Sequence, residues 1–348
     1  MSVFRPVLPS CPATTGHLLS LSRDIADYPD GIVLPIDKPY RWTSADVIRK
    51  VKFAAVKHFR KKNLKVGHAG TLDPLATGVL LVCIGPACKR AQEFQDHDKE
   101  YVAGIRFGAT TPSYDLEKEV DRTFPYDQVT LEAVRAVLPS FLGVQEQIAP
   151  LFSAQSVDGV RAYEMARKLY KSSRAVSAVP ASSSLIPGSS SVIPGSTGNL
   201  PDFDAAALET LQRSTITIHE IELLDFSTPP PAPLEMTDPP SGASAHGVGQ
   251  LFFDLSGEKK LVRGVPADAQ STASSRIHVA DTSTLGLPEA HIRIACSKGT
   301  YIRAFARDLG EALGTGAHLS SLVRTRTGDF RLEDALTLDQ ALALLAEA

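Results

Sequence analysis

The residues best suited to chemistry lie in one short run, Gly67–Gly78, whose sequence is GHAGTLDPLATG. Its glycines let the backbone turn tightly or let another segment come close. Because Asp73 precedes a proline, its backbone is held extended and a turn follows it. A carboxylate presented in this way could act as a nucleophile or as a base. Turn and helix-cap positions also select aspartate, and spacing alone favours this second interpretation.

Metal and hydrolase chemistry find no support in the sequence. His68 has no partner at metal-ligand spacing, and Cys83 and Cys88 lie in or just after a stretch that is typical of a core strand. The chain contains neither a G-x-S-x-G nor an H-E-x-x-H motif. We therefore expect no metal site and neither serine-hydrolase nor zinc-peptidase activity.

A second run that could carry chemistry is CSKGTYIR, Cys296–Arg303. Its Lys298-Gly299-Thr300 imitates the end of a phosphate-binding loop, but the first glycine of that motif is missing, so an NTPase is not supported. The run joins a strand-like stretch to a helix-like one. Such a turn presents Arg303 well for binding a phosphate or for pairing with a carboxylate.

Basic residues follow one another between positions 49 and 65 without an acidic residue among them. They are Arg49, Lys50, Lys52, Lys57, Arg60, Lys61, Lys62 and Lys65. A solvated surface would explain them, but an uninterrupted basic run in a chain of net charge -3 favours a phosphate-facing stripe. Should it fail to bind RNA, the alternative face lies around Arg324, Arg326 and Arg331.

Apolar runs and periodicity predict the elements that position these residues. Strand patterns occur at Ile32–Ile36, Val79–Ile84, Tyr101–Phe107, Thr215–Phe226, Gln250–Leu255 and His291–Ala295. Helical patterns occur at Val47–Ala55, after an N-cap at Thr43 or Ser44, and at Leu131–Leu138, Ala162–Tyr170, Tyr301–Leu313 and Leu338–Ala346. Because strands and helices do not alternate regularly, we expect an α+β fold with a mixed, mainly antiparallel central sheet flanked by helices.

Segments rich in Ser, Pro and Gly interrupt this order at about 172–201 and 228–249, and more weakly at about 267–283. They lack the apolar periodicity of a core and are typical of flexible surface insertions. Since strand patterns resume on either side, we interpret them as long loops within one domain.

The composition agrees with a globular protein of a reducing compartment. Four cysteines lie scattered without a C-x-x-C pair, which argues against a disulfide framework. No apolar run is long enough for a signal peptide or a membrane span, so we expect a cytoplasmic protein without membrane association. The net charge of -3 counts mildly against nucleic-acid binding by bulk charge. Whether the chain can bind a nucleic acid therefore depends on where its basic residues lie.

Several blocks in a fixed order resemble the signature of the TruB family of pseudouridine synthases. They are Gly31–Thr43, Gly67–Gly78, Lys99–Tyr101, Gly108–Leu116, Cys296–Arg303 and Gly316–Leu319. The family contains the bacterial tRNA pseudouridine-55 synthases and their eukaryotic relatives. The similarity covers most of residues 31–170 and resumes over about 212–226 and 286–335. The resemblance implies a pseudouridine synthase fold and cofactor-independent isomerisation of the T-loop uridine of tRNA.

The resemblance also implies roles for individual residues. Asp73 matches the family's catalytic aspartate, Tyr101 the tyrosine that stacks on the flipped base, and Arg303 the partner of the aspartate. The remaining matches are His68, which helps to displace the target base, Tyr163 and Leu322, which line the pocket, and Lys38. Lys38 either supports the active-site loop or merely packs its stem.

The chain departs from the bacterial pattern at both ends. We expect an N-terminal extension over residues 1–30, a catalytic domain over 31–335 and a C-terminal helix over 336–348, without the RNA-binding PUA domain of many relatives. A monomer would then have to hold the T-arm of tRNA with the catalytic domain itself. Within the basic run, the residues expected to contact the RNA backbone are Arg60, Lys61, Lys62 and Lys65.

Two other hypotheses remain. The chain could be a tRNA-binding folding factor (an RNA chaperone) whose catalysis is dispensable, or a synthase that modifies another RNA resembling the T-loop. The presence of Asp73, Tyr101 and Arg303 together favours an active tRNA enzyme, because a pure binder has no need of this set.

Overall fold

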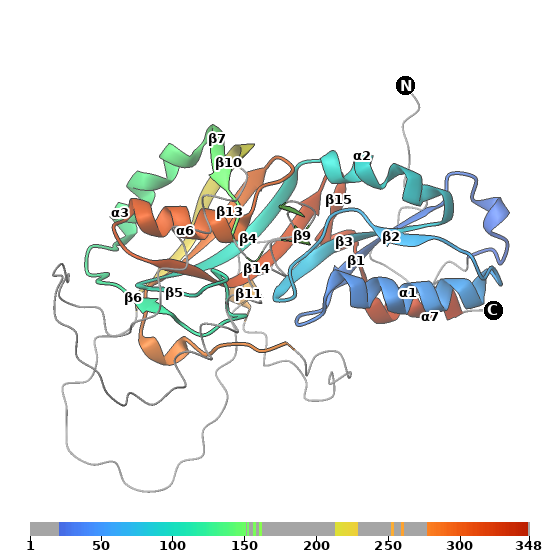
Figure 1. Ribbon diagram of the computed structural model, residues 1–348, viewed down its shortest axis with the longest axis horizontal. Coiled ribbons are helices and arrows are strands. Elements are labelled where there is room, and N and C mark those ends of the chain that lie inside the picture. The colour runs from blue at the N-terminus through green and yellow to red at the C-terminus, as the bar shows by residue number, and fades with distance from the viewer. Residues whose placement is uncertain are drawn as a thin grey trace, which may run out of the picture.

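The computed structural model describes residues 21–150, 152, 156–157, 160–161, 213–228, 252–253, 259–260 and 277–346. Its centre is a 10-stranded sheet in which the strands follow the order β16-β1-β3-β14-β4-β13-β10-β7, with β15 beside β14 and β2 beside β3 (Figure 1). The strands of this sheet are β1 (Ile32–Lys38), β2 (Val66–His68), β3 (Ala76–Ile84), β4 (Lys99–Phe107), β7 (Gly143–Ile148), β10 (Arg213–Ser227), β13 (Glu289–Cys296), β14 (Ala317–Thr327), β15 (Phe330–Arg331) and β16 (Leu336–Thr337).

The pairing within the sheet is antiparallel except between β1 and β16 and between β14 and β3. The expectation of an α+β fold on a mixed, mainly antiparallel sheet is therefore confirmed. Short two-stranded pieces are formed by β5 (Ala109–Thr110) with β6 (Arg122–Thr123), β8 (Ser156–Val157) with β9 (Val160–Arg161), and β11 (Phe252–Phe253) with β12 (Lys259–Lys260).

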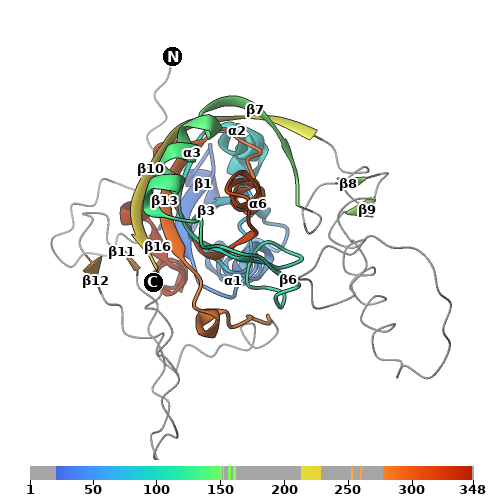
Figure 2. The same cartoon turned by 90° about the vertical axis from the view of Figure 1, so that its left-hand side faces the viewer.

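Helices cover the sheet in two groups. The α-helices are α1 (Ser44–His58), α2 (Ala91–Asp96), α3 (Leu131–Val137), α6 (Ile302–Ala312) and α7 (Leu338–Ala346). Helices α1 and α7 lie side by side on the half of the sheet that contains β1 and β3 (Figure 1). Helices α6 and α3 pack on β4, β13 and β10, and the sheet curves around α6 (Figure 2).

Burial on both faces explains why the first five residues of β1, Ile32–Ile36, are all apolar. Ile32, Leu34 and Ile36 face α1 and α7, whereas Val33 faces the core under α2. Both faces are therefore buried, which selects a continuous apolar run rather than an alternating one. The strand continues two residues beyond its predicted end at Ile36, to Lys38.

Helix α1 begins as its sequence predicts. Thr43 is the N-cap, and its side chain accepts a hydrogen bond from the backbone N–H of Asp46. The Asp46 carboxylate in turn accepts from the backbone N–H of Thr43, which completes a capping box. This cap fixes the start of α1 beside the run that contains Asp73.

The segments outside the predicted catalytic domain pack into its core. Ile25 and Leu338 belong to the same buried cluster as α1, and His58 bonds to the carbonyls of Ser22 and Leu345 at 3.1 and 3.0 Å. Residues 21–30 and 336–346 therefore belong to the layer that packs with α1 against one face of the sheet.

Several predicted segments lie outside the described residues. These are the helix at 162–170, the insertion at 172–201, nearly all of 228–249 and most of the strand at 250–255. The end of the weak insertion at 267–283 is described, and it packs against the domain: Ala280 N–H donates to the Leu116 carbonyl at 2.8 Å, and Thr282 is buried. Of the described helices, none has the length and apolar character needed to cross a membrane.

Candidate active site

Asp73 lies on the loop between β2 and β3, and buried neighbours hold the loop in place. Leu72 and Leu75 on either side of it are buried. The Ser44 hydroxyl, in the first turn of α1, donates to the Leu72 carbonyl at 3.0 Å and accepts from the Leu72 N–H at 2.9 Å. The loop is therefore fixed to the start of α1, and its one carboxylate remains partly exposed.

Arg303, from the first turn of α6, grips the Asp73 carboxylate with two hydrogen bonds. Its Nε donates to Oδ2 at 2.8 Å and its Nη2 donates to Oδ1 at 3.2 Å. The same guanidinium donates to the carbonyls of Ser113 at 3.1 Å and Phe152 at 3.0 Å. The Arg303 side chain is only 6% exposed, whereas that of Asp73 is 36% exposed. Arg303 is thus a fixed support, and Asp73 is the group that remains accessible.

Lys38, at the end of β1, supports the same loop from below. It is fully buried, and its amine donates to the carbonyls of Trp42 at 2.6 Å, Pro39 at 2.9 Å and Pro74 at 3.2 Å. Burial lowers the pKa of Lys38 to about 7, although the nearby Asp73 carboxylate opposes this. Of the two roles that the sequence offers for Lys38, the bond to Pro74 favours support of the loop.

Asp115 is a second carboxylate beside Arg303, and sequence reasoning did not single it out. Its Oδ2 lies 3.9 Å from Arg303 Nε, and its Oδ1 accepts from the Ser113 hydroxyl at 2.6 Å and from the Glu117 N–H at 2.9 Å. Burial raises the pKa of Asp115 to about 6, opposed by the charge of Arg303 and reinforced by that of Asp73. Its only sequence signal was its place in the block Gly108–Leu116.

The raised pKa of Asp115 predicts a pH-dependent stability. A group whose pKa is higher in the folded protein stabilises the fold at low pH, and this is lost as the pH rises through the folded value. A rise in the pKa of Asp115 from 3.8 to about 6 changes the free energy of unfolding by about 3 kcal/mol. Asp115→Asn should therefore be more stable than wild type at pH 8 by up to about that amount, with the difference closing toward pH 4. Urea unfolding at pH 4, 6 and 8 checks this, and a difference that stays constant with pH would contradict it.

A small pocket opens beside the Asp73–Arg303 pair. It is lined by Asp73, Leu75, Ala76, Asp115, Leu116, Arg303, Leu319, Ser320, Ser321 and Leu322. The strand β14 therefore contributes one wall, Leu319–Leu322. At one end of this wall the Leu319 N–H donates to the Tyr114 carbonyl, and at the other end Leu322 pairs with Ala76 of β3. Leu322 lies where the resemblance implies an apolar pocket residue.

Tyr101 and Arg324 lie opposite each other on β4 and β14. Tyr101 is half-buried, and burial raises its pKa. Arg324 is only 2% exposed and donates to the Val79 carbonyl at 2.7 Å and the Gly70 carbonyl at 3.3 Å. The suggestion that Arg324 belongs to an alternative RNA-binding face is therefore wrong. Its guanidinium is buried and donates hydrogen bonds to the backbone of β3 and of the Asp73 loop.

His68 is not among the residues that line the pocket. His68 ends β2 half-buried, and its Nδ1 has no hydrogen-bond partner among the described residues. Burial, together with the charge of Arg324, lowers the pKa of His68, which favours the neutral imidazole. Tyr163 lies outside the described residues. Within the described part of the chain, no three His, Cys, Asp or Glu residues gather as metal ligands would.

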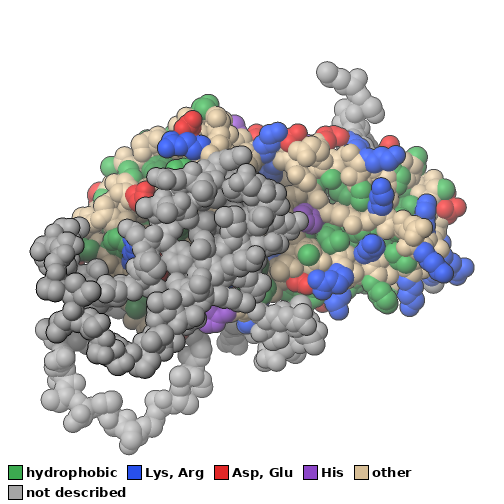
Figure 3. All heavy atoms as spheres, in the orientation of Figure 1, with side chains coloured by type: hydrophobic (Ala, Val, Ile, Leu, Met, Phe, Trp, Pro, Cys, Tyr) green, Lys and Arg blue, Asp and Glu red, His purple; other side chains and the backbone are tan. Residues whose placement is uncertain are grey.

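The residues expected to contact the RNA backbone lie apart from the pocket. Arg60, Lys61, Lys62 and Lys65 are all exposed on the segment between α1 and β2. Since α1 has 15 residues, about 22 Å of helix separates this segment from the Asp73 loop. Figure 3 shows Lys and Arg side chains gathered on this end of the molecule, with few acidic side chains between them.

The chain is similar to known proteins over most of its length. Residues 57–183 match the family described as TruB family pseudouridylate synthase (N terminal domain), and residues 303–348 match the tRNA pseudouridylate synthase B C-terminal domain. The chain is 39% identical over 313 residues to tRNA pseudouridine synthase B of Phocaeicola vulgatus, which covers 90% of this chain and 92% of that protein. It is 40% identical over 310 residues to the protein of the same name from Bacteroides thetaiotaomicron, covering 89% of this chain and 91% of the relative. A solved structure described as a Cbf5-Nop10-Gar1 complex matches with a TM-score of 0.46 and 21% identity, over 90% of this chain and 54% of that chain.

Proposed function

The chain belongs to the TruB family of pseudouridylate synthases, and from this premise we propose that it converts the T-loop uridine of tRNA, position 55, to pseudouridine. The observation that carries the proposal is the Asp73 carboxylate, held by two hydrogen bonds from the buried Arg303 at the edge of a pocket. The names of the relatives support tRNA as the substrate.

The chemistry of the isomerisation matches what Asp73 can supply. The bond between uracil N1 and ribose C1′ breaks, the base turns, and C5 bonds to C1′; C5 then loses its proton and N1 takes one up, so the product is an isomer of the substrate. An anionic group beside C1′ can attack that carbon or stabilise the positive charge that develops on it. Nothing is oxidised or reduced in this sequence, so the carboxylate needs no cofactor.

Arg303 acts on the reaction through Asp73. Its guanidinium stays protonated in proteins and therefore cannot serve as an acid or base. Two hydrogen bonds to backbone carbonyls fix the guanidinium, and its two hydrogen bonds to Asp73 fix the direction of the carboxylate. We infer that Arg303 is a positioning residue.

The surroundings of the pocket fit a uracil that has left its stack. Leu75, Leu116, Leu319 and Leu322 give it apolar walls. In the proposed complex Tyr101 stacks on the flipped base, and His68 and Tyr163 help to displace and enclose it. Tyr101 lies opposite Arg324 on the neighbouring strand, and Arg324 donates to the Gly70 carbonyl at the start of the Asp73 loop.

The remainder of the tRNA extends beyond the pocket. We propose that Arg60, Lys61, Lys62 and Lys65 contact its phosphates, since all four are exposed and no acidic residue interrupts the run. A monomer acting in the cytoplasm completes the proposal.

Mapping pseudouridine in a transcribed tRNA tests this function. Purified protein, incubated with the transcript in EDTA, should convert U55 and no other uridine, and a U55C transcript should remain unmodified. Carbodiimide labelling followed by reverse transcription locates the product. Tight tRNA binding without any pseudouridine would contradict the proposal and favour an RNA folding factor. Modification at another uridine would reject the T-loop assignment.

A further inference from the structure

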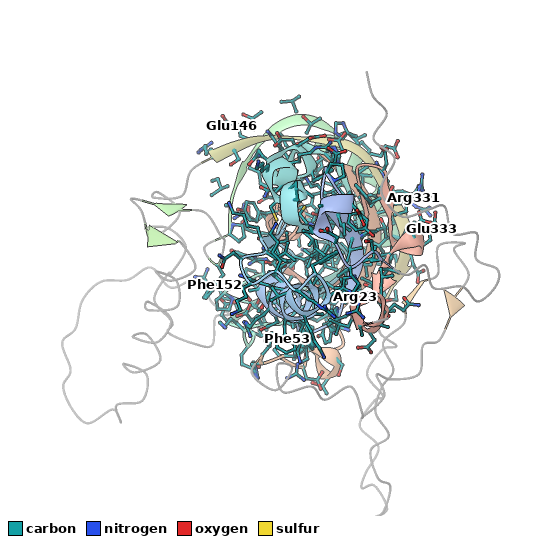
Figure 4. The ribbon with its side chains drawn as sticks, turned by 90° about the vertical axis from the view of Figure 1, so that its right-hand side faces the viewer. Arg23, Phe53, Glu146, Phe152, Arg331 and Glu333 are labelled. Carbon is teal, nitrogen blue, oxygen red and sulfur yellow. The ribbon has the colours of Figure 1, made fainter. Side chains whose placement is uncertain are left out.

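An aromatic side chain stands fully in solvent on the outward face of α1. Phe53 is 77% exposed, although Val47, Val51 and Ala55 of the same helix are buried. Figure 4 shows Phe53 on the outer side of α1, pointing away from the sheet. A single exposed apolar residue needs no explanation by itself, so its neighbours decide whether it matters.

The neighbours of Phe53 are basic. Residues three and four positions away share its face of the helix. These are Arg49, Lys50 and Lys57, which are all exposed. The nearest carboxylate on the helix, that of Asp46, is occupied by its cap bonds and by Arg49 at 3.0 Å. The face is therefore an aromatic ring with a rim of positive charge.

Charge selects the occupant of this face. Two copies of the chain meeting here would place like charges against one another, which costs free energy. An apolar protein surface would desolvate the lysines without pairing them. A polynucleotide satisfies both features, because it offers flat bases for the ring and phosphates for the rim. Stacking requires a base that is not enclosed in a double helix.

The position of α1 brings this face to the same RNA that enters the pocket. The helix starts at the Asp73 loop, where Ser44 bonds to Leu72. Phe53 follows nine residues later, about 13 Å along the helix axis. An RNA that places a nucleotide at Asp73 can therefore run along α1.

We propose that the outward face of α1 is a second RNA-contact surface, on which Phe53 stacks against an unpaired nucleotide of the substrate while Lys50 and Lys57 contact the flanking phosphates. This inference rests on the proposed function, because it takes the bound RNA to be the substrate. It adds a second surface to the proposed RNA-binding site. On this surface the contribution of base stacking and that of phosphate contacts can be measured separately, by Kd and by the salt dependence of Kd.

Binding of Phe53 variants to tRNA at several salt concentrations tests the proposal. Phe53→Ala should raise Kd roughly 5- to 150-fold, the range expected for one lost base–aromatic stack, while leaving the salt slope unchanged. Phe53→Tyr, which keeps the ring, should bind within about 2-fold of wild type. Lys50→Gln with Lys57→Gln should instead flatten the slope by about one to two. Phe53→Ala should raise Kd and KM, and it should leave the single-turnover rate at saturating enzyme unchanged.

Val144→Ala is the matched control. Val144 is 73% exposed on β7, whose Glu146 lies at the edge of the molecule opposite Phe53 (Figure 4), and its truncation should leave Kd unchanged. Wild-type affinity in Phe53→Ala would overturn the proposal. So would a change in oligomeric state by sedimentation with RNA affinity intact, since the face would then join two copies. Binding is scored without turnover, so failure to form pseudouridine would reject the proposed function while the Kd comparison still decides the role of Phe53.

Discussion

Asp73→Asn should lower the single-turnover rate of pseudouridine formation by at least about 10⁴-fold, as expected when a reacting group is removed. The amide has nearly the same shape and can still accept a hydrogen bond from Arg303, but it carries no negative charge for C1′. Affinity for tRNA should stay within a few-fold of wild type, since the grip on RNA lies elsewhere. Tritium release from tRNA labelled at uracil C5 gives the rate, and filter binding gives Kd.

Asp127→Asn serves as the control, because Asp127 is an exposed aspartate outside the pocket and its substitution should change neither quantity. If Asp73→Asn turns over within about tenfold of wild type, the carboxylate is not the reacting group.

Arg303→Lys should reduce the same rate by at least about 10²-fold, although the positive charge is kept. One ammonium cannot reproduce two hydrogen bonds to Asp73 together with those to Ser113 and Phe152. Asp73 would then lose the orientation on which its attack depends. Arg303→Ala leaves the carboxylates of Asp73 and Asp115 without their shared cation and should also destabilise the fold. The cost of breaking a buried pair is about 3–5 kcal/mol, and the lower end applies because Asp73 is partly exposed.

Arg307 provides a matched control one turn further along α6. It is buried to a similar degree and bonds to the Ile148 carbonyl at 3.0 Å, but it does not line the pocket. Arg307→Lys should therefore lower stability while changing the rate little. Partial recovery of Arg303→Ala by millimolar guanidinium would support a positioning role. Equal rate losses in Arg303→Lys and Arg307→Lys would show a general structural effect instead.

Local signals account for the part of the fold that the sequence predicts well. The capping box at Thr43 and Asp46 and the apolar run in β3 depend on neighbours in the chain, and the structure places α1 and β3 there. Strand β3 begins at Ala76, three residues before the predicted start, because its pairing with β14 extends beyond the apolar run.

The strand β14, at the centre of the sheet, had no sequence signal. Irregularities after Leu319 and after Arg324 break its register with β4, so its side chains do not alternate over its length. Polar residues such as Ser320 and Thr325 also occupy buried positions along it. The period-two pattern that marks a half-buried strand is therefore absent.

The site itself depends on contacts between distant parts of the chain. Asp73 and Arg303 are 230 positions apart, and only the family resemblance linked them before the structure did. Arg324 looked like a surface arginine because nothing local indicates that its guanidinium is buried beneath the Asp73 loop. Asp115 was missed for the same reason, since its altered pKa comes from burial and from two charges brought near by folding.

The most direct test of catalysis by Asp73 is the pseudouridine content of position 55 in tRNA from a bacterial strain that lacks its own synthase for this position. The strain would carry either the wild-type chain or Asp73→Asn at equal protein level. We expect pseudouridine 55 to be restored by the wild-type chain and to be absent with Asp73→Asn. Restoration by both would contradict a catalytic role for Asp73, and restoration by neither would contradict the proposed substrate.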